Sequence, residues 1–461
     1  MSTTLELYRK LSKGFKISII EGAINTLGSS FAGPMLIPFF IRRGADVGFL
    51  SLYVSLGFIL VPLSQIISAF VLNNYRENRR KIMFSCALIN RCLWMFLALA
   101  TFIETIDINM ILVIILLLRP FGTLASLAWT DLLTDLVNIR IRGRAFAFRN
   151  SIIGLMNILG LSISTLIYSL PYPKSYQYGF SIGAFLMIFS TPLLCKYEDP
   201  LKPKGIRIDF KTLREILCNR DILRDSLSIA IWNSSVNIVG AIWTYHLFNI
   251  IGATEDWIVL INLTGSIMGI VGNTFWGKAY DKFGPKNIFL LTCPGIALIP
   301  ILFPHLHTLV GQICLQAYAS FLWTGFGLAN FNYAISFEPS LRHLYIAIYN
   351  SVPAIAASIS TNIGAYLYEH YGITAFYVSG VLRLIALVIL LKVVSSRGVS
   401  YEELKLSSHF YRFIVFSRGI ATLALGEFLF ALRIFYSLIV ISLVLALLIS
   451  IYTLALIILK I

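Results

Sequence analysis

The stretch that decides the fold is 277-GKAYDKFGPK-286, a short charged segment between two long apolar runs. The run before it covers residues 257–276, and the run after it covers residues 287–303. An α-helix needs roughly 20 apolar residues to cross the hydrocarbon core of a bilayer, and both runs are close to that length. We therefore expect one membrane helix to end here, the chain to turn sharply at the bilayer surface, and a second helix to return.

Several residues of this segment have distinct expected roles. Gly277 has no side chain, so we expect it to let the two helices approach closely. The Asp281 carboxylate can accept hydrogen bonds from free N–H groups at the start of the next helix, where the helix dipole favours an anion. Lys282 and Lys286 place the turn on the cytoplasmic side, because cytoplasmic loops are rich in Lys and Arg.

The whole chain has the composition of a polytopic membrane protein. Of its 461 residues, 57% are hydrophobic and only 13% are charged, whereas a soluble domain carries about 25% charged residues. The formal net charge of +15 is concentrated in alternate loops, which makes nucleic acid a poor explanation for it. The six cysteines include no CxxC pair and lie mostly within apolar runs, so we interpret them as small buried hydrophobic residues.

The apolar runs predict twelve membrane spans in two sets of six. We expect the first six at 17–40, 47–72, 82–103, 108–134, 147–170 and 176–195. We expect the second six at 226–248, 256–276, 287–304, 308–335, 345–368 and 373–395. These spans divide the chain into a cytoplasmic N-terminus, an N-terminal bundle, a cytoplasmic linker, a C-terminal bundle and a tail, at 1–16, 17–196, 197–224, 225–395 and 396–461.

Three segments outside these spans carry further expectations. Residues 210–227 have the pattern of an amphipathic helix on the membrane surface. Residues 434–459 contain no charge and are long enough to span, which favours a thirteenth membrane helix, with a helix lying in the interface as the alternative. Residues 1–16 are charged and lack a cleavage-site pattern, so we interpret the first span as a retained helix and not a signal peptide.

The basic residues predict the orientation in the membrane. The connections after even-numbered spans contain basic clusters such as residues 79–81, whereas those after odd-numbered spans hold only Arg42, Arg43 and Lys174. The segment before the first span is also basic. Because Lys and Arg collect on the cytoplasmic side, we expect a multi-pass protein of the cell membrane with its N-terminus in the cytoplasm.

The two halves of the chain repeat one another. At an offset of 208 residues, Asn25 falls on Asn233 and Gly57 falls on Gly265. The charged turn then falls on 69-AFVLNNYRENRRK-81, which lacks the aspartate and keeps only the basic end. At an offset of 200 residues, a second pair of stretches matches: 146-FAFRNSIIG-154 falls on 346-IAIYNSVPA-354. Two matching stretches predict duplicated halves.

The pattern Gly-x-x-x-Asp-Lys-x-Gly-x-Lys of residues 277–286 resembles the signature turn between the second and third helices of each half of the major facilitator superfamily. It departs at the last position, where Asn287 replaces a second basic residue. The segment 129-WTDLLTDLVNIRIRGRAFAFRN-150 is similar to a block that many bacterial and archaeal members carry from span four into span five. The resemblance covers about residues 17–395. It implies an all-α membrane fold of two six-helix bundles, with helices one, four, seven and ten around a central cavity.

Polar residues of those four helices are therefore candidates for contact with a substrate. They recur at helical spacing, and an unpaired amide in hydrocarbon costs on the order of a kcal/mol or more, so they should face water, substrate or another helix. The candidates are Asn25, Ser29, Arg119, Thr123, Ser126, Asn233, Asn237, Gln312, Gln316 and Trp323. Hydrogen bonding between helices, without any substrate contact, is the alternative for each of them.

Arg119 is the sharpest single candidate, because it lies near mid-membrane, where a charge costs at least roughly 3 kcal/mol. The resemblance implies a role in proton or substrate coupling. Glu21, about one turn inside the first span, and Asp131 are the other candidates for proton coupling. Arg91 and Arg383 lie in helices that are peripheral by resemblance, so we expect a structural role for them.

A gate of charged residues is expected at the cytoplasmic end. Asp131 and Asp135 lie four residues apart on one face of span four, so they can form a charge network with Arg142, Arg144 or Arg149. The alternative is that Asp131 titrates as the coupling site. The corresponding gate residues of the second half are Gly277, Asp281, Lys282, Gly284 and Lys286.

Taken together, these features predict a secondary active transporter that moves a small solute by alternating access, with protons as one candidate coupling partner. A transporter-like sensor that binds without moving solute is the alternative. A membrane-embedded enzyme is less favoured, since the chain has neither an HExxH pair nor a phosphate-binding loop with Gly-Lys-Ser/Thr. We expect a monomer without metal, cofactor or nucleic acid. A basic cavity with amides suits an organic anion or a polyol better than a bare cation.

Overall fold

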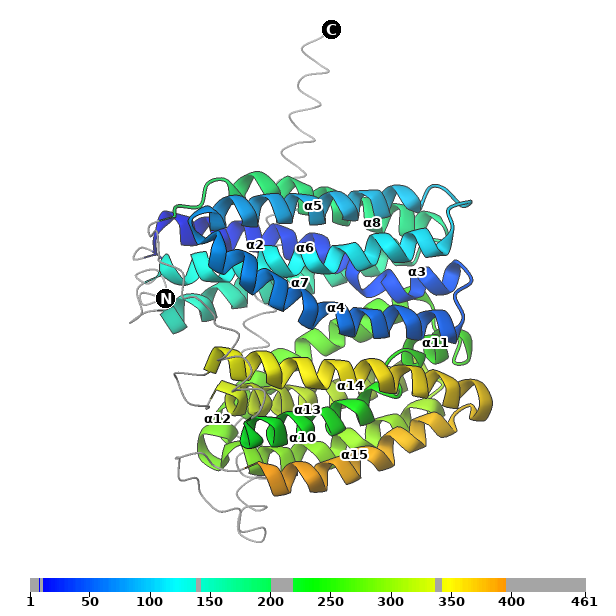
Figure 1. The fold of residues 1–461 in the computed structure, drawn as a ribbon. Helices are drawn as coiled ribbons and strands as arrows, with labels where there is room; N and C mark the ends of the chain where they lie inside the picture. The colour runs from blue at the N-terminus through cyan, green and yellow to red at the C-terminus, as the bar shows by residue number, and fades with distance from the viewer. Residues whose placement is uncertain (1–7, 9–10, 138–141, 200–218, 336–341, 395–461) are drawn as a thin grey trace. The chain divides into compact units, whose positions relative to one another are not determined.

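The structure is a computed structural model, and it describes residues 8, 11–137, 142–199, 219–335 and 342–394, all within the unit Met1–Tyr401. Every regular element among these residues is helical (Figure 1). The expected tail helix at 434–459 lies outside the described residues. So does most of the expected surface helix at 210–227, whose last residues belong to the first helix of the second half.

The first half of the chain forms a bundle of long helices. They are α2 (Lys13–Ala32), η1 (Gly33–Met35), α3 (Leu36–Arg42), α4 (Val47–Asn74), η2 (Arg76–Asn78), α5 (Arg79–Ala100), α6 (Ile108–Asp135), α7 (Arg142–Tyr168) and α8 (Lys174–Leu194). The first expected span is interrupted, since the 3₁₀ turn η1, which contains Pro34, separates α2 from α3. Proline lacks an N–H group and its ring clashes with the carbonyl four residues earlier, so it breaks a regular helix.

The second half repeats this pattern. Its helices are α10 (Arg220–Asn237), α11 (Ile242–Asn249), α12 (Glu255–Leu302), η3 (Phe303–His305), α13 (Leu309–Ile335), α14 (Arg342–Tyr371) and α15 (Thr374–Val393). The 48 residues of α12 would measure about 72 Å as one straight helix, more than twice the roughly 30 Å hydrocarbon core. The helix is broken at Gly284, whose φ of 71° and ψ of 177° are not helical, so α12 provides two crossings.

The signature turn differs from the expectation in where its residues act. A Cβ added at Gly277 would meet no atom within 4 Å, so this glycine does not bring two helices together here. The change of direction is at Gly284, because a positive φ costs glycine little. Asp281 lies in the helical turn before the break, and its carboxylate accepts no hydrogen bond within the described residues. The close approach is at Gly325, where an added Cβ would lie 2.6 Å from the Trp276 ring.

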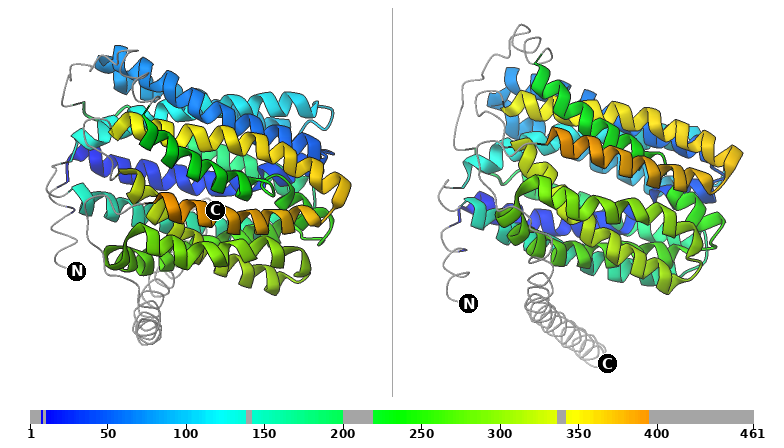
Figure 2. Two further views of the ribbon diagram at one scale, coloured as in Figure 1. Left: turned by 60° about the horizontal axis from the view of Figure 1, so that its bottom comes forward. Right: turned by 90° about the horizontal axis from the view of Figure 1, so that it is seen from below.

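The helices pack into two bundles that correspond to the two halves. In the first, α2 packs on α7 and α8, α5 packs on α6 and α8, and α4 packs on α6. In the second, α10 packs on α14 and α15, and α12 packs on α13 and α15. The halves meet where α4 contacts α14 and α7 contacts α12. Figures 1 and 2 show that the axes of the long helices in both halves are roughly parallel.

Eight helical segments within the described residues are long and apolar enough to cross a membrane. One of them, Glu255–His305, contains the break at Gly284 and so crosses twice. The chain is therefore an all-α polytopic membrane protein built from two helical bundles, as the apolar runs predicted.

Candidate functional site

A cavity of about 390 Å³ lies in the first half, lined mainly by α2, α5, α6 and α7. Small-molecule sites in proteins usually have volumes of roughly 300–1,000 Å³, so this cavity is large enough for a metabolite. Three charged residues line it, and three asparagine amides accompany them. They are Glu21, Arg91, Arg149, Asn25, Asn90 and Asn150.

Glu21 and Arg91 form a buried ion pair in the wall of this cavity. Their exposed fractions are 5% and 6%, and one guanidinium nitrogen of Arg91 donates to a Glu21 carboxylate oxygen. The other terminal nitrogen donates to Thr191 Oγ1 at 3.0 Å. We expected Arg91 to be peripheral, but its charge lies at the cavity with the acid of the first span as its partner. A buried pair of this kind is stable only while both partners remain, because one alone is an uncompensated charge.

Arg149 lies against the same cavity and is packed on an aromatic ring. Its guanidinium carbon is 4.4 Å from the centre of the Trp129 ring, a cation–π geometry. The indole Nε1 of Trp129 donates to the Tyr197 hydroxyl at 3.3 Å, which fixes the plane of the ring. A Cβ at Gly22 would come within 2.5 Å of the guanidinium, so glycine at this position makes room for it.

A second cavity of about 470 Å³ adjoins the first, and the two share Asn90, Gly122 and Ser126 in their linings. Arg119 and Thr123 line the second cavity, where we expected them to face a substrate. The Arg119 guanidinium packs on α4, since an added Cβ at Gly57 would be 2.9–3.2 Å from its atoms. Within the described residues, Arg119 makes neither an ion pair nor a hydrogen bond.

In the second half, a neutral side chain packs against the glycine that corresponds to Gly57. A Cβ at Gly265, the repeat partner of Gly57, would lie 2.9 Å from Gln316 Nε2. The same amide nitrogen donates to Ser320 Oγ at 3.0 Å. Gln316 therefore occupies, in the second half, the place that Arg119 occupies in the first.

The remaining cavity candidates are engaged in other ways. Ser29 Oγ donates to the Thr26 carbonyl at 3.0 Å, and Asn237 Nδ2 donates to the Asn233 carbonyl at 2.8 Å. The buried amide of Gln312 donates to the Leu306 carbonyl at 2.7 Å, which ties the connection between α12 and α13 to the start of α13. Trp323 packs against two aromatic side chains, Trp232 and Phe326. These residues line neither of the two first-half cavities.

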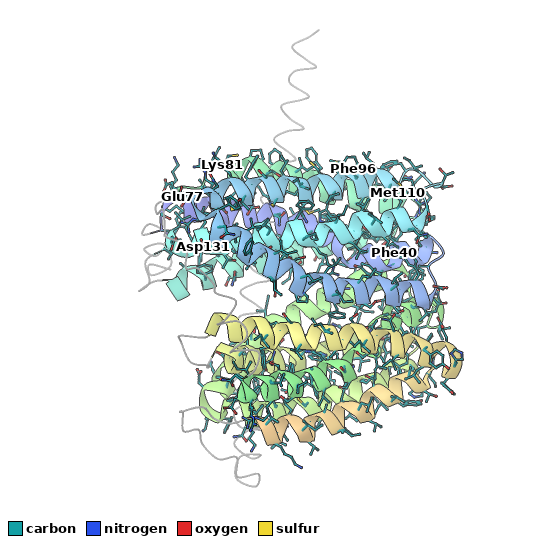
Figure 3. All side chains as sticks on the ribbon, viewed as in Figure 1. Phe40, Glu77, Lys81, Phe96, Met110 and Asp131 are labelled. Atoms are coloured by element: carbon teal, nitrogen blue, oxygen red, sulfur yellow. The ribbon has the colours of Figure 1, made fainter. Side chains whose placement is uncertain are left out.

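A charge cluster lies at the end of the first half where α5 begins and α6 ends. The fully buried Arg79 side chain contacts three carboxylates: Asp131 at 2.8 Å, Asp135 at 2.7 Å and Asp199 at 2.7 Å. Figure 3 shows Asp131 at the same end as Glu77 and Lys81, with Phe40 and Met110 at the other end.

Arg79 is thus one partner of the two span-four aspartates. The side chains of Arg142 and Arg144 lie outside the described residues, and Arg149, the third candidate partner, is at the cavity. The gate residues Asp281, Lys282 and Lys286 of the second half are exposed.

At the opposite end, an ion pair joins the two halves. Arg42, the last residue of α3, donates from Nε to Glu255 Oε1 at 2.7 Å and from a terminal nitrogen to Oε2 at 3.0 Å. The Tyr176 hydroxyl also donates to this carboxylate, at 3.3 Å. Ser51 Oγ of α4 donates to Asn362 Oδ1 of α14 at 3.1 Å, also across the two halves. Neither Arg42 nor Glu255 was among the residues selected from the sequence.

A sequence model of the Major Facilitator Superfamily matches residues 20–360. The chain belongs to the Major Facilitator Superfamily. No curated protein sequence matches it significantly. Membership explains the duplicated halves and the contacts of α4 with α14 and of α7 with α12, because superfamily proteins are built from two parallel repeats.

Solved structures of superfamily transporters have the same fold. The D-xylose-proton symporter is 14% identical, with a TM-score of 0.65, and the match covers 84% of this chain and 99% of that one. The nucleoside transporter NupG is 13% identical, with a TM-score of 0.64, covering 83% and 98%. XylE from E. coli in an inward open conformation is 13% identical, with a TM-score of 0.62, covering 85% and 98%. At such identities the likeness shows the fold alone.

Proposed function

We propose that this chain is a secondary active transporter that moves a small solute across the membrane by alternating access. The observation that supports this most is the Arg42–Glu255 ion pair, which joins the halves at one end of the bundles. Two hydrogen bonds also join the halves: Ser51 to Asn362, between α4 and α14, and Asn157 to Ser266, between α7 and α12. Cavities of metabolite size are present in the first half. Breaking the joined end and closing the other would carry a bound solute across.

We further propose that the protein is a monomer in the cell membrane with its N-terminus in the cytoplasm. The support is the distribution of basic residues along the sequence. In this orientation the Arg42–Glu255 end faces outward, and we propose that the structure corresponds to an inward-facing state.

We propose Glu21 as the group that couples transport to protons. Its carboxylate lies in the cavity wall with Arg91 as its ionic partner. Protonation would cancel the carboxylate charge and release Arg91, so the cavity would gain one positive charge and lose a fixed contact between α2 and α5. Asp131 is a weaker candidate, because it is bound to Arg79 and lines neither cavity.

We propose a cytoplasmic gate with one part in each half of the chain. In the first half, the Arg79 cluster joins the start of α5 to the end of α6. In the second half, Asp281 and Lys282 are exposed at the signature turn. We propose that they contact the first half when the cytoplasmic end closes.

A disulfide across the joined end tests alternating access. In a cysteine-free chain, Ser51→Cys and Asn362→Cys should form a disulfide that holds this end closed. In proteoliposomes, the cross-linked protein should no longer take up a labelled solute identified by a metabolite screen. Reduction should restore uptake. The matched control is Ser235→Cys with Ser379→Cys, since these residues are in contact within the second half, where Ser379 Oγ donates to the Ser235 carbonyl at 2.7 Å. Its disulfide should leave uptake unchanged. Continued uptake by the fully cross-linked Ser51–Asn362 pair would refute the mechanism.

A further inference from the structure

The two first-half cavities carry more positive than negative charge. In the cavity of about 390 Å³, Glu21 is bound to Arg91, so the charge of Arg149 remains uncompensated. In the adjoining cavity, Arg119 is the one charged residue among those that line it. The combined surface therefore presents two cationic side chains without an acidic partner from the described residues.

Arg149 is the more deeply buried of the two. Its exposed fraction is 8%, and its buried Nε has no hydrogen-bond partner within the described residues. Glu21 interacts with it through space but makes its ion pair with Arg91. A buried guanidinium without a partner is unfavourable in the absence of a ligand. Burying the unpaired Arg149 guanidinium lowers the folding stability of the ligand-free protein. An anion bound in the cavity would pair with this charge and offset that loss.

The Arg149 side chain is also held in place for binding. The Trp129 ring supports one face of the guanidinium, and Tyr197 fixes that ring through a hydrogen bond. Little conformational entropy is then lost when a ligand binds, because the planar group is already oriented.

The sequence repeat shows that the fold itself does not require a charge at this position. At the offset of 200 residues, Arg149 corresponds to Tyr349. Tyr349 is 1% exposed, and its hydroxyl donates to Asn330 Oδ1 at 2.6 Å. The same place in the second bundle is thus filled by a neutral side chain with an internal partner. The charge of Arg149 is a specific feature of the first half.

We propose that the first-half cavity binds a small organic anion, with its carboxylate or phosphate held by Arg149. This rests on the proposed transport function, because it names the class of solute bound at the same site. The guanidinium fork matches the geometry of carboxylate and phosphate oxygens. The amides of Asn25, Asn90 and Asn150 supply hydrogen bonds for other polar groups of the solute. A neutral polyol would leave the Arg149 charge unpaired, and a cation would be repelled.

Ligand binding to the purified full-length chain tests this proposal without any transport measurement. The probes are succinate, benzoate and glycerol 3-phosphate as anions, glucose as a neutral polyol and choline as a cation, measured by calorimetry and thermal shift. We expect at least one anion to bind and glucose and choline not to bind. The Arg149→Tyr variant, which copies the second half, should weaken anion binding by about tenfold or more. Arg149→Lys should recover part of it.

Arg224→Gln is the matched control, since Arg224 is a half-exposed arginine of α10 outside both cavities. It should bind the anion like the parent. The thermal unfolding of each variant without ligand shows that it is folded. Binding of glucose or choline in preference to all three anions, binding of none of the anions, or equal binding by parent and Arg149→Tyr would each overturn the proposal. A solute that binds through Arg149 but is never transported would instead refute the proposed function and leave this inference standing.

Discussion

The buried Glu21–Arg91 pair gives a stability prediction with a sharp internal control. Both side chains are at most 6% exposed, so removing either one leaves a charge without a partner inside the bundle. At a contact of about 3 Å and an effective dielectric constant of about 20, the attraction between unit charges is roughly 5 kcal/mol. The desolvation cost of both ions offsets much of it. We therefore expect Glu21→Ile or Arg91→Ile alone to destabilise the protein by about 3–5 kcal/mol.

The second half indicates what should happen when both residues change. At the offset of 208 residues, Ile229 corresponds to Glu21 and Ile299 corresponds to Arg91, and both isoleucines are 3% exposed. The Glu21→Ile/Arg91→Ile double variant thus places at both positions the residue that the second half carries there. Thr191 keeps a partner, since its hydroxyl also donates to the Met187 carbonyl at 3.3 Å. We expect the double variant to lie within about 2 kcal/mol of the parent, because a buried ion pair can be replaced by apolar residues at little cost.

Equilibrium unfolding of the four proteins in one mixed-micelle system measures this cycle. The coupling energy should be at least about 4 kcal/mol, because the double variant should lose far less stability than the summed losses of the two single variants. Additive losses in the double variant, or single variants as stable as the parent, would refute the assignment of a buried, mutually dependent pair. The double variant should also bind solute without proton-dependent transport.

Three further predictions follow from the site and the orientation. Arg119→Gln should fold with unchanged or higher thermal stability, because Gln316 fills the equivalent place in the second half. Solute uptake by this variant should fall by about tenfold or more, because the charge at the cavity is lost. Uptake equal to the parent would show that Arg119 does not contact the solute. Arg79→Met should destabilise the chain by roughly 3 kcal/mol, since three carboxylates lose their common partner, and unchanged unfolding would show that the cluster adds nothing. In a cysteine-free chain, an impermeant maleimide added to intact cells should label Thr254→Cys and not Glu77→Cys, both exposed positions; the reverse pattern would invert the orientation.

The general architecture could be predicted from the sequence because a bilayer limits the possible solutions. Apolar runs of spanning length must form helices, and a basic turn between two of them marks a surface. The repeat at 208 residues paired Gly57 with Gly265. In the structure a polar side chain packs against each glycine: Arg119 of α6 against Gly57, and Gln316 of α13 against Gly265. What the pattern could not give was the exact place of the break, since Gly277 and Gly284 both fit a sharp turn.

The pairing of charges could not be predicted from the sequence. Glu21 could reach Arg91, Arg119 or Arg149 in a bundle whose helix rotations are unknown, and the sequence did not indicate Arg91 as its partner. Similarly, Asp131 and Asp135 pair with Arg79, which sequence analysis treated only as part of a basic loop. One signal could have helped. Arg149 and Glu21 are charged where the second half carries Tyr349 and Ile229, and such differences between repeats point to function and not to packing.

Flux of a bound anion through proteoliposomes tests the central claim most directly. The protein is reconstituted, the anion that binds in an Arg149-dependent manner is supplied with a radiolabel, and its uptake is followed with and without an imposed pH gradient. We predict saturable uptake down the solute gradient, acceleration by the pH gradient in the parent, and loss of that acceleration in the Glu21→Ile/Arg91→Ile variant. An anion that binds yet crosses under no gradient faster than in protein-free liposomes would contradict the account and identify the chain as a binding protein in a transporter fold.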